Sequence, residues 1–168
     1  MRFELKTLSA DALPRALEKA ERYRLLNEPL EAESICLDVL TIDSSNQTAL
    51  VTLLLALTDQ FDTDVRSALG EAHDVIARMS EPYARAYYTG IVHERRAKAQ
   101  LRQNTPGSGP RAYEMLREAM VWFERAEDLR PSGNDDAVLR WNACARLLMR
   151  DRHLVPANED RGEPLLLE

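Results

Sequence analysis

The sequence has few of the residues on which catalysis, metal binding or disulfide bonding commonly depend. Its 168 residues include two cysteines, three histidines and six glycines, and aromatic side chains make up 6%. Cys36 and Cys144 are far apart and form no C-x-x-C pair, so we expect two buried, reduced thiols. No Ser, His, Asp order and no glycine-rich phosphate loop is present. These shortages predict a protein that is not an enzyme and that uses neither a metal nor a cofactor.

The chain also lacks a net positive charge and long apolar runs. The formal net charge is −6, which argues against a protein that neutralises a nucleic-acid backbone. The most apolar stretch, Ala49 to Leu57, is shorter than the roughly 20 residues that a membrane span requires. Arg2, Glu4 and Lys6 leave no apolar core for a secretory signal. We therefore predict a cytoplasmic protein that binds neither nucleic acid nor membrane.

Helical periodicity, by contrast, runs along nearly the whole chain, and strand-like alternation occurs only in the first eight residues. Capping residues and prolines divide the periodic region into about seven helices. The expected helices end near Leu26, Asp43, Gln60, Met79, Gln103, Pro131 and Arg150. We thus predict an N-terminal arm at 1–12, a helical repeat domain at 13–150, and a C-terminal tail at 151–168 that is extended or docked.

One frame of small and apolar residues occurs three times in the periodic region. It appears as Ala119, Phe123, Ala126 and Pro131, as Ala32, Cys36, Val39 and Ser44, and as Ala68, Ala72, Val75 and Ser80. Spacings of 3, 4 and 7 place the first three residues of each set on one face of a helix. Small side chains recur there because a second helix must approach closely. The frame therefore predicts helix packing in an internal repeat.

This arrangement of paired helices resembles the tetratricopeptide repeat (TPR) family, whose unit is a 34-residue antiparallel helix pair. The frames begin near Leu13, Gln47, Tyr83 and Asn134, which gives periods of 34, 36 and 51 residues. The resemblance implies an all-α, right-handed α–α superhelix, a TPR-like solenoid of three degenerate repeats and a C-terminal capping helix. The long third period departs from the family. We explain it by a lengthened hairpin around Ala99 to Arg111 that projects past the stack and includes a loop from Asn104 to Pro110.

In that family the first helices of successive pairs line a concave groove that holds a peptide. The resemblance therefore implies a partner-binding groove built from the first helix of each hairpin and from the closing helix. Its predicted residues are Leu17, Glu21, Arg24, Leu25, Val51, Leu55, Asp59, Tyr87, Ile91, Glu94, Arg95, Val138, Asn142 and Arg146. Val51 and Leu55 are equally well explained as core residues. The implied function is a non-enzymatic adaptor or scaffold that binds a peptide or protein segment.

Two specific chemistries do not fit the sequence. Some members of the family clamp acidic C-termini of chaperones with a set of Lys, Asn and Arg side chains. The equivalent positions here are Leu17, Glu21, Thr52, Ala84 and Tyr87, none of which matches. His93 and Glu94 begin like a zinc-protease motif, but Ala97 stands where the second histidine ligand is required.

Several alternatives remain open at this stage. The acidic balance and small size also suit a specialised chaperone for an exported or unstable partner protein. A small-molecule sensor or enzyme would use a pocket near His93. Lys98 shares a helix face with Arg95 and Arg102, which either pair with nearby glutamates or dock an acidic partner. Trp141 lies on a last helix that no further hairpin covers, which predicts a homodimer contact or a cap formed by Leu165–Leu167.

Overall fold

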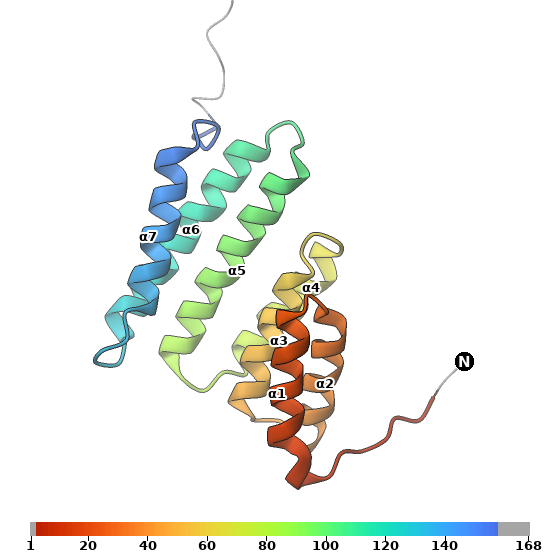
Figure 1. Cartoon of the computed structure of the whole chain (residues 1–168). Helices are drawn as coiled ribbons and strands as arrows, with labels where there is room; N and C mark the ends of the chain where they lie inside the picture. The colour runs from red at the N-terminus through yellow and green to blue at the C-terminus, as the bar shows by residue number, and fades with distance from the viewer. Residues whose placement is uncertain (1–2, 158–168) are drawn as a thin grey trace, which may run out of the picture. The chain divides into compact units, whose positions relative to one another are not determined.

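The computed structural model describes residues 3–157, and all regular structure within that range is helical (Figure 1). After a short 3-10 turn at Ala10–Ala12, the helices are α1 (Leu13–Leu25), α2 (Pro29–Ile42), α3 (Gln47–Asp59), α4 (Val65–Ala77), α5 (Pro82–Gln103), α6 (Ser108–Leu129) and α7 (Asp136–Arg150). The predicted all-α fold class is confirmed. None of these helices combines the length and apolar character needed to cross a membrane.

Local sequence signals explain where the helices begin. The Asn46 side chain accepts a hydrogen bond from the Ala49 N–H at 2.9 Å and caps α3. Asp64 caps α4 in the same way, accepting from the Ser67 N–H at 3.2 Å. Pro29 and Pro82 stand at the first positions of α2 and α5, where a missing N–H costs nothing.

The chain divides into two compact units, Met1–Glu81 and Pro82–Glu168. In unit 1, α1, α2, α3 and α4 pack in chain order, and α1 also contacts α3. Eight of the 13 residues of α3 are buried, as expected for a helix that is apolar on nearly every side. The α2 frame residues Ala32, Cys36 and Val39 are buried, as are Ala68, Ala72 and Val75 of α4. The packing role predicted for the repeated frame is confirmed in this unit.

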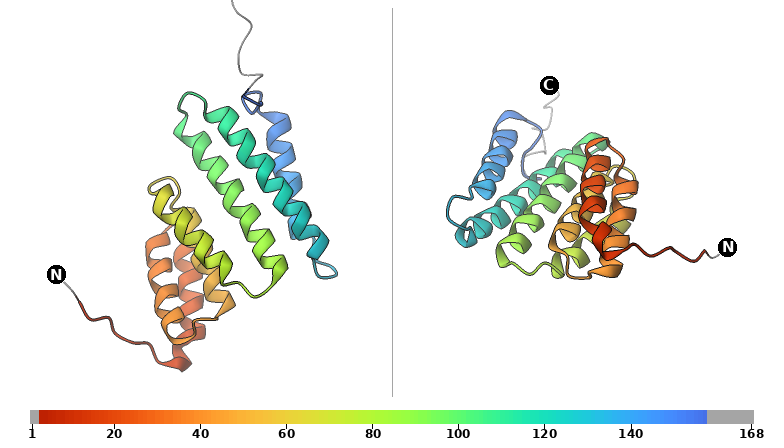
Figure 2. Two further views of the ribbon diagram at one scale, coloured as in Figure 1. Left: turned by 180° about the vertical axis from the view of Figure 1, so that it is seen from behind. Right: turned by 60° about the horizontal axis from the view of Figure 1, so that its bottom comes forward.

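Unit 2 consists of the long α5–α6 hairpin and α7, with α6 in contact with both other helices (Figure 2). Ala119, Phe123 and Ala126, the fullest form of the frame, are completely buried on α6. Gly90 of α5 lies against the Phe123 ring, where a β-carbon would come within 2.5 Å of Cε1. Small residues therefore let α5 approach α6 closely, as the frame requires.

The tip of the α5–α6 hairpin is covered by the segment that follows α7. Helix α6 begins at Ser108, inside the expected loop, because Gly107 adopts a left-handed conformation with φ 76° that favours glycine. The carbonyl oxygen of His153 lies so near Gly109 that a β-carbon there would be 2.2 Å away. The adjacent Leu154 is buried. Helices α5 and α6 have 22 residues each, compared with 13 or 14 in α1–α4, so this hairpin is longer than the others, and residues 151–154 dock on its end. The Leu165–Leu167 cap lies outside the described residues.

Candidate functional site

A buried carboxylate joins α5 to α7 in unit 2. Glu94 of α5 is 1% exposed. Its Oε1 accepts hydrogen bonds from the Lys98 ammonium, one turn further along α5, and from Nη1 of Arg140 on α7 at 3.5 Å. The side chains of Lys98 and Arg140 are each 41% exposed. One buried anion therefore holds two cations from different helices at the surface.

The second oxygen of Glu94 is unusual. Oε2 is buried and has no hydrogen-bond partner among the described residues. An unsatisfied buried polar atom costs free energy, and most such atoms in folded proteins are paired.

Three tyrosines of α5 extend the site away from Glu94. Tyr83 and Tyr87 are stacked with ring centroids 5.7 Å apart, and Tyr88 meets Tyr87 edge-on at 5.1 Å. The Tyr83 hydroxyl donates to Oδ1 of Asn134, next to the start of α7, at 3.2 Å. Tyr83 and Tyr87 pack on a floor of three alanines contributed by α5, α6 and α7, namely Ala86, Ala126 and Ala137. We refer to Tyr83, Tyr87, Glu94, Lys98 and Arg140 as the α5–α7 face.

The electrostatics of this face follow from its partial burial. Burial opposes the charge of Arg140, but the Glu94 charge and a hydrogen bond with Tyr87 outweigh it and raise the pKa of the guanidinium. Burial, with the neighbouring tyrosines, raises the pKa of Tyr88 to about 12. Arg140 therefore stays charged and Tyr88 stays a neutral phenol at physiological pH.

The structure brings together some of the groove residues predicted for unit 2. Tyr87 and Glu94 belong to the α5–α7 face. Ile91, between them, is buried, so we assign it to the core rather than to a binding surface. The remaining predicted residues of this unit lie elsewhere on the same helices: Arg95, Val138 and Asn142 are half-buried and Arg146 is exposed.

Arg140 was missed at the sequence level. The signal for it is weak: it follows the buried Ala137 by three residues and precedes the buried Cys144 by four, so a cation interrupts an apolar stripe. A charge at such a position needs a partner, and Glu94 is that partner.

The predicted groove residues of unit 1 include one clear pair. Nε of Arg24 on α1 donates to Oδ2 of Asp59 on α3 at 2.7 Å, and both side chains are mostly buried. Leu17, Val51 and Leu55 are half-buried, whereas Glu21 and Leu25 are exposed. In unit 1, then, an arginine–carboxylate pair joins α1 to α3, which lie on either side of α2 in the chain. In unit 2 a similar pair joins α5 to α7, on either side of α6.

Three cavities among the described residues lie away from these ion pairs. A cavity of about 530 Å³ lies between α1 and α2, a second of about 480 Å³ lies along α1, and a third of about 320 Å³ lies at the α5–α6 tip. His93 lines none of the three. Within residues 3–157, no three side chains of His, Cys, Asp or Glu gather as a metal site.

No family model, curated protein or solved structure matches the chain. The resemblance to the tetratricopeptide repeat family therefore stays a prediction that depends on the repeated frame.

Proposed function

We propose that this protein is a non-enzymatic adaptor with a TPR-like repeat, and that its α5–α7 face binds a peptide segment carrying an acidic side chain. The observation that carries the proposal is the Glu94 cluster. The Glu94 carboxylate is buried beneath two half-exposed cations, so the cluster differs from an ion pair between two exposed side chains. The carboxylate instead orients Lys98 and Arg140 toward the surface.

The repeat architecture supports a binding role for this face. The same frame of small and apolar residues is buried in α2, α4 and α6. An arginine and a carboxylate join α1 to α3, and another such pair joins α5 to α7. In stacked helical hairpins the first helices form the inner surface, on which extended partners are bound. We extend this arrangement to a right-handed superhelix as part of the proposal.

The chemistry of the face selects the partner. Lys98 and Arg140 outnumber Glu94, so this part of the face has one positive charge in excess, whereas the charge of Asp136 acts at the other end, near Tyr83. Guanidinium groups bind carboxylates with charge-assisted hydrogen bonds. Tyr83 and Tyr87, which are half-buried, offer ring surface to an apolar side chain next to the acidic one. We therefore expect the partner segment to place an acidic residue within a few residues of an aromatic or aliphatic one.

The test uses a displayed library of random 12-residue peptides selected on the full chain. Dissociation constants of the enriched peptides are then measured by fluorescence anisotropy for the wild type, Lys98→Gln and Arg140→Gln. We expect acidic and apolar residues to be enriched, and affinity to fall about tenfold or more in each variant, since a hydrogen bond to a charged group contributes about 1.5–3 kcal/mol.

Arg117→Gln provides the matched control, because Arg117 is an exposed arginine of α6, outside the α5–α7 face. Its affinities should equal those of the wild type. The proposal fails if no peptide is enriched, or if enriched peptides bind Lys98→Gln and Arg140→Gln as tightly as the wild type.

A further inference from the structure

An open apolar groove lies between α1 and α2 of unit 1. It is the cavity of about 530 Å³, and its apolar wall includes Ala16, Tyr23, Leu30 and Ile35. Lys19 lines it from α1, and Glu31 and Asp38 line it from α2, so the two helices contribute opposite charges. Leu30 is largely exposed although it faces this groove. We call this feature the α1–α2 groove.

An apolar segment begins at one end of the groove. Leu8 is part of the groove lining, and it is the last residue of the segment 3–8, which we call the arm from here on. Phe3 and Leu5 are 79% and 82% exposed. They alternate with Glu4 and Lys6, as in an extended segment with one apolar and one charged side. The arm therefore carries two large apolar side chains that nothing in its own unit covers.

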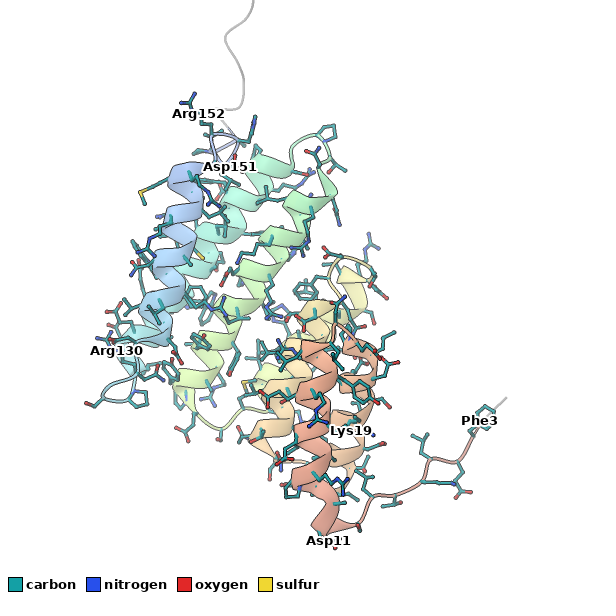
Figure 3. The ribbon with its side chains drawn as sticks, in the orientation of Figure 1. Phe3, Asp11, Lys19, Arg130, Asp151 and Arg152 are labelled. Atoms are coloured by element: carbon teal, nitrogen blue, oxygen red, sulfur yellow. The ribbon has the colours of Figure 1, made fainter. Side chains whose placement is uncertain are left out.

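The arm runs away from its own groove. Figure 3 shows Phe3 far from Lys19, which stands on α1 at the groove. To occupy that groove, the arm would have to reverse direction close to Leu8. Residues 3–8 contain no glycine, proline, asparagine, aspartate or serine, the residues that tight reversals favour, and the Ser9 that follows is extended, with φ −78° and ψ 146°. Phenylalanine and threonine favour extended backbone instead. The geometry thus leads the arm outward, toward another molecule.

We propose that the chain forms an arm-exchanged homodimer in which the arm of each copy occupies the α1–α2 groove of the other. Phe3 and Leu5 enter the apolar groove, and Glu4 and Lys6, on the other side of the arm, stay at its rim, where they pair with the oppositely charged Lys19 and Glu31. The arrangement is reciprocal: each copy supplies one arm and one groove, so the contact closes on itself as a twofold dimer. It covers at once the exposed arm residues and the open groove.

Cross-linking between copies tests the contact directly. Leu5→Cys and Ser34→Cys variants, carrying different affinity tags, are mixed and treated with a short bismaleimide; Ser34 lines the groove. Cys36 and Cys144 are buried and give little background. We expect a product of twice the chain mass that carries both tags. Leu5→Cys mixed with Ser67→Cys, an exposed position on α4, is the control and should give none.

Two results would overturn the proposal at this step. One is the absence of the doubly tagged product. The other is a Leu5→Cys/Ser34→Cys double variant that cross-links only within one chain, which would place the arm in its own groove. Peptide capture by the α5–α7 face is measured on other residues, so either outcome leaves the proposed function standing.

Sedimentation equilibrium gives an independent measurement. The wild type should be dimeric, and Leu5→Glu should raise the dimer dissociation constant at least tenfold. Leu139→Glu is the matched control, because Leu139 is an exposed leucine of α7 near Trp141. A dimer that Leu139→Glu dissociates and Leu5→Glu leaves intact would assign the contact to α7. A wild-type protein that is still monomeric at 100 μM, roughly one hundred times a micromolar dissociation constant, would exclude arm exchange.

Discussion

Gly90 of α5 lies in direct contact with the ring of Phe123 on α6. A β-carbon at position 90 would lie 2.5 Å from Cε1 and 2.7 Å from Cδ1 of that ring. Phe123 in turn contacts Tyr87, with ring centroids 5.9 Å apart. The distance between α5 and α6 is therefore set by the lack of a side chain at Gly90, and the position of Tyr87 on the α5–α7 face depends on it.

Gly90→Ala should destabilise the protein although alanine is the better helix former. The added methyl group overpacks the Phe123 ring, which costs about 1–3 kcal/mol, and the gain in helix propensity is only about 1 kcal/mol. We expect a lower free energy of unfolding by urea denaturation. Gly70→Ala is the control: nothing lies within 4 Å of its β-carbon, so this variant should be stabilised by about 0.5–1 kcal/mol. Equal stabilisation of both variants would contradict the close contact.

The two thiols should report on the two units separately. Burial raises the pKa of Cys36 in unit 1 and of Cys144 in unit 2 to about 12, so little thiolate forms at pH 8. Reaction with a thiol reagent should be at least about 100-fold slower in the native protein than in urea. The Cys36→Ala and Cys144→Ala variants, each with one cysteine left, show which labelling rate belongs to which thiol.

Gly90→Ala should accelerate labelling of Cys144 more than labelling of Cys36, because Gly90 belongs to unit 2. Equal acceleration of both thiols would mean that the two units open in one cooperative step.

Glu94→Met should leave the protein at least as stable as the wild type, within about 1 kcal/mol, because it removes a buried carboxylate with an unpaired oxygen. Lys98 and Arg140 are half-exposed and can be hydrated when the carboxylate is gone. The same change should weaken peptide binding, since Arg140 loses the group that orients it. Thermal unfolding and anisotropy measure the two effects. A loss of more than about 3 kcal/mol would instead indicate that the carboxylate stabilises the fold.

The Arg24–Asp59 pair should contribute more to stability than an exposed pair of equal length. A double-mutant cycle with Arg24→Met and Asp59→Leu should give a coupling energy of about 1 kcal/mol, the upper range for ion pairs that retain some solvent contact. Arg130 and Glu127, also 2.7 Å apart but more exposed, are the control and should couple more weakly. Coupling that is no larger than in the control would show that α1 and α3 are held by apolar contacts alone.

The features that the sequence predicted correctly are local ones. The frame Ala32, Cys36, Val39 follows from helical spacing, and the start of α3 follows from a capping asparagine beside an apolar run. Both depend only on residues a few positions apart. The seven helices and the all-α class were accessible for the same reason.

The features that the sequence did not predict depend on how each helix is rotated relative to its neighbours and on how much of its surface those neighbours bury. Periodicity places Tyr87, Ile91 and Glu94 on one face of α5, but it cannot distinguish the half-buried tyrosine from the buried isoleucine. The contact of Glu94 with Arg140 spans 46 positions and requires the relative rotation of α5 and α7. The α1–α2 groove likewise depends on how α1 and α2 pack against each other, which the periodicity of each helix does not specify.

The docking of residues 151–154 on the α5–α6 tip bears on how shortened forms of the protein should be cut. Helix α7 ends at Arg150, and a fragment trimmed there would keep all the helices found in residues 3–157. It would nevertheless lose Leu154 and the His153 backbone that lies against Gly109, and so leave the far end of the hairpin uncovered. The shortest form of unit 2 that keeps its hairpin end covered therefore extends to Leu154, several residues past the last turn of α7.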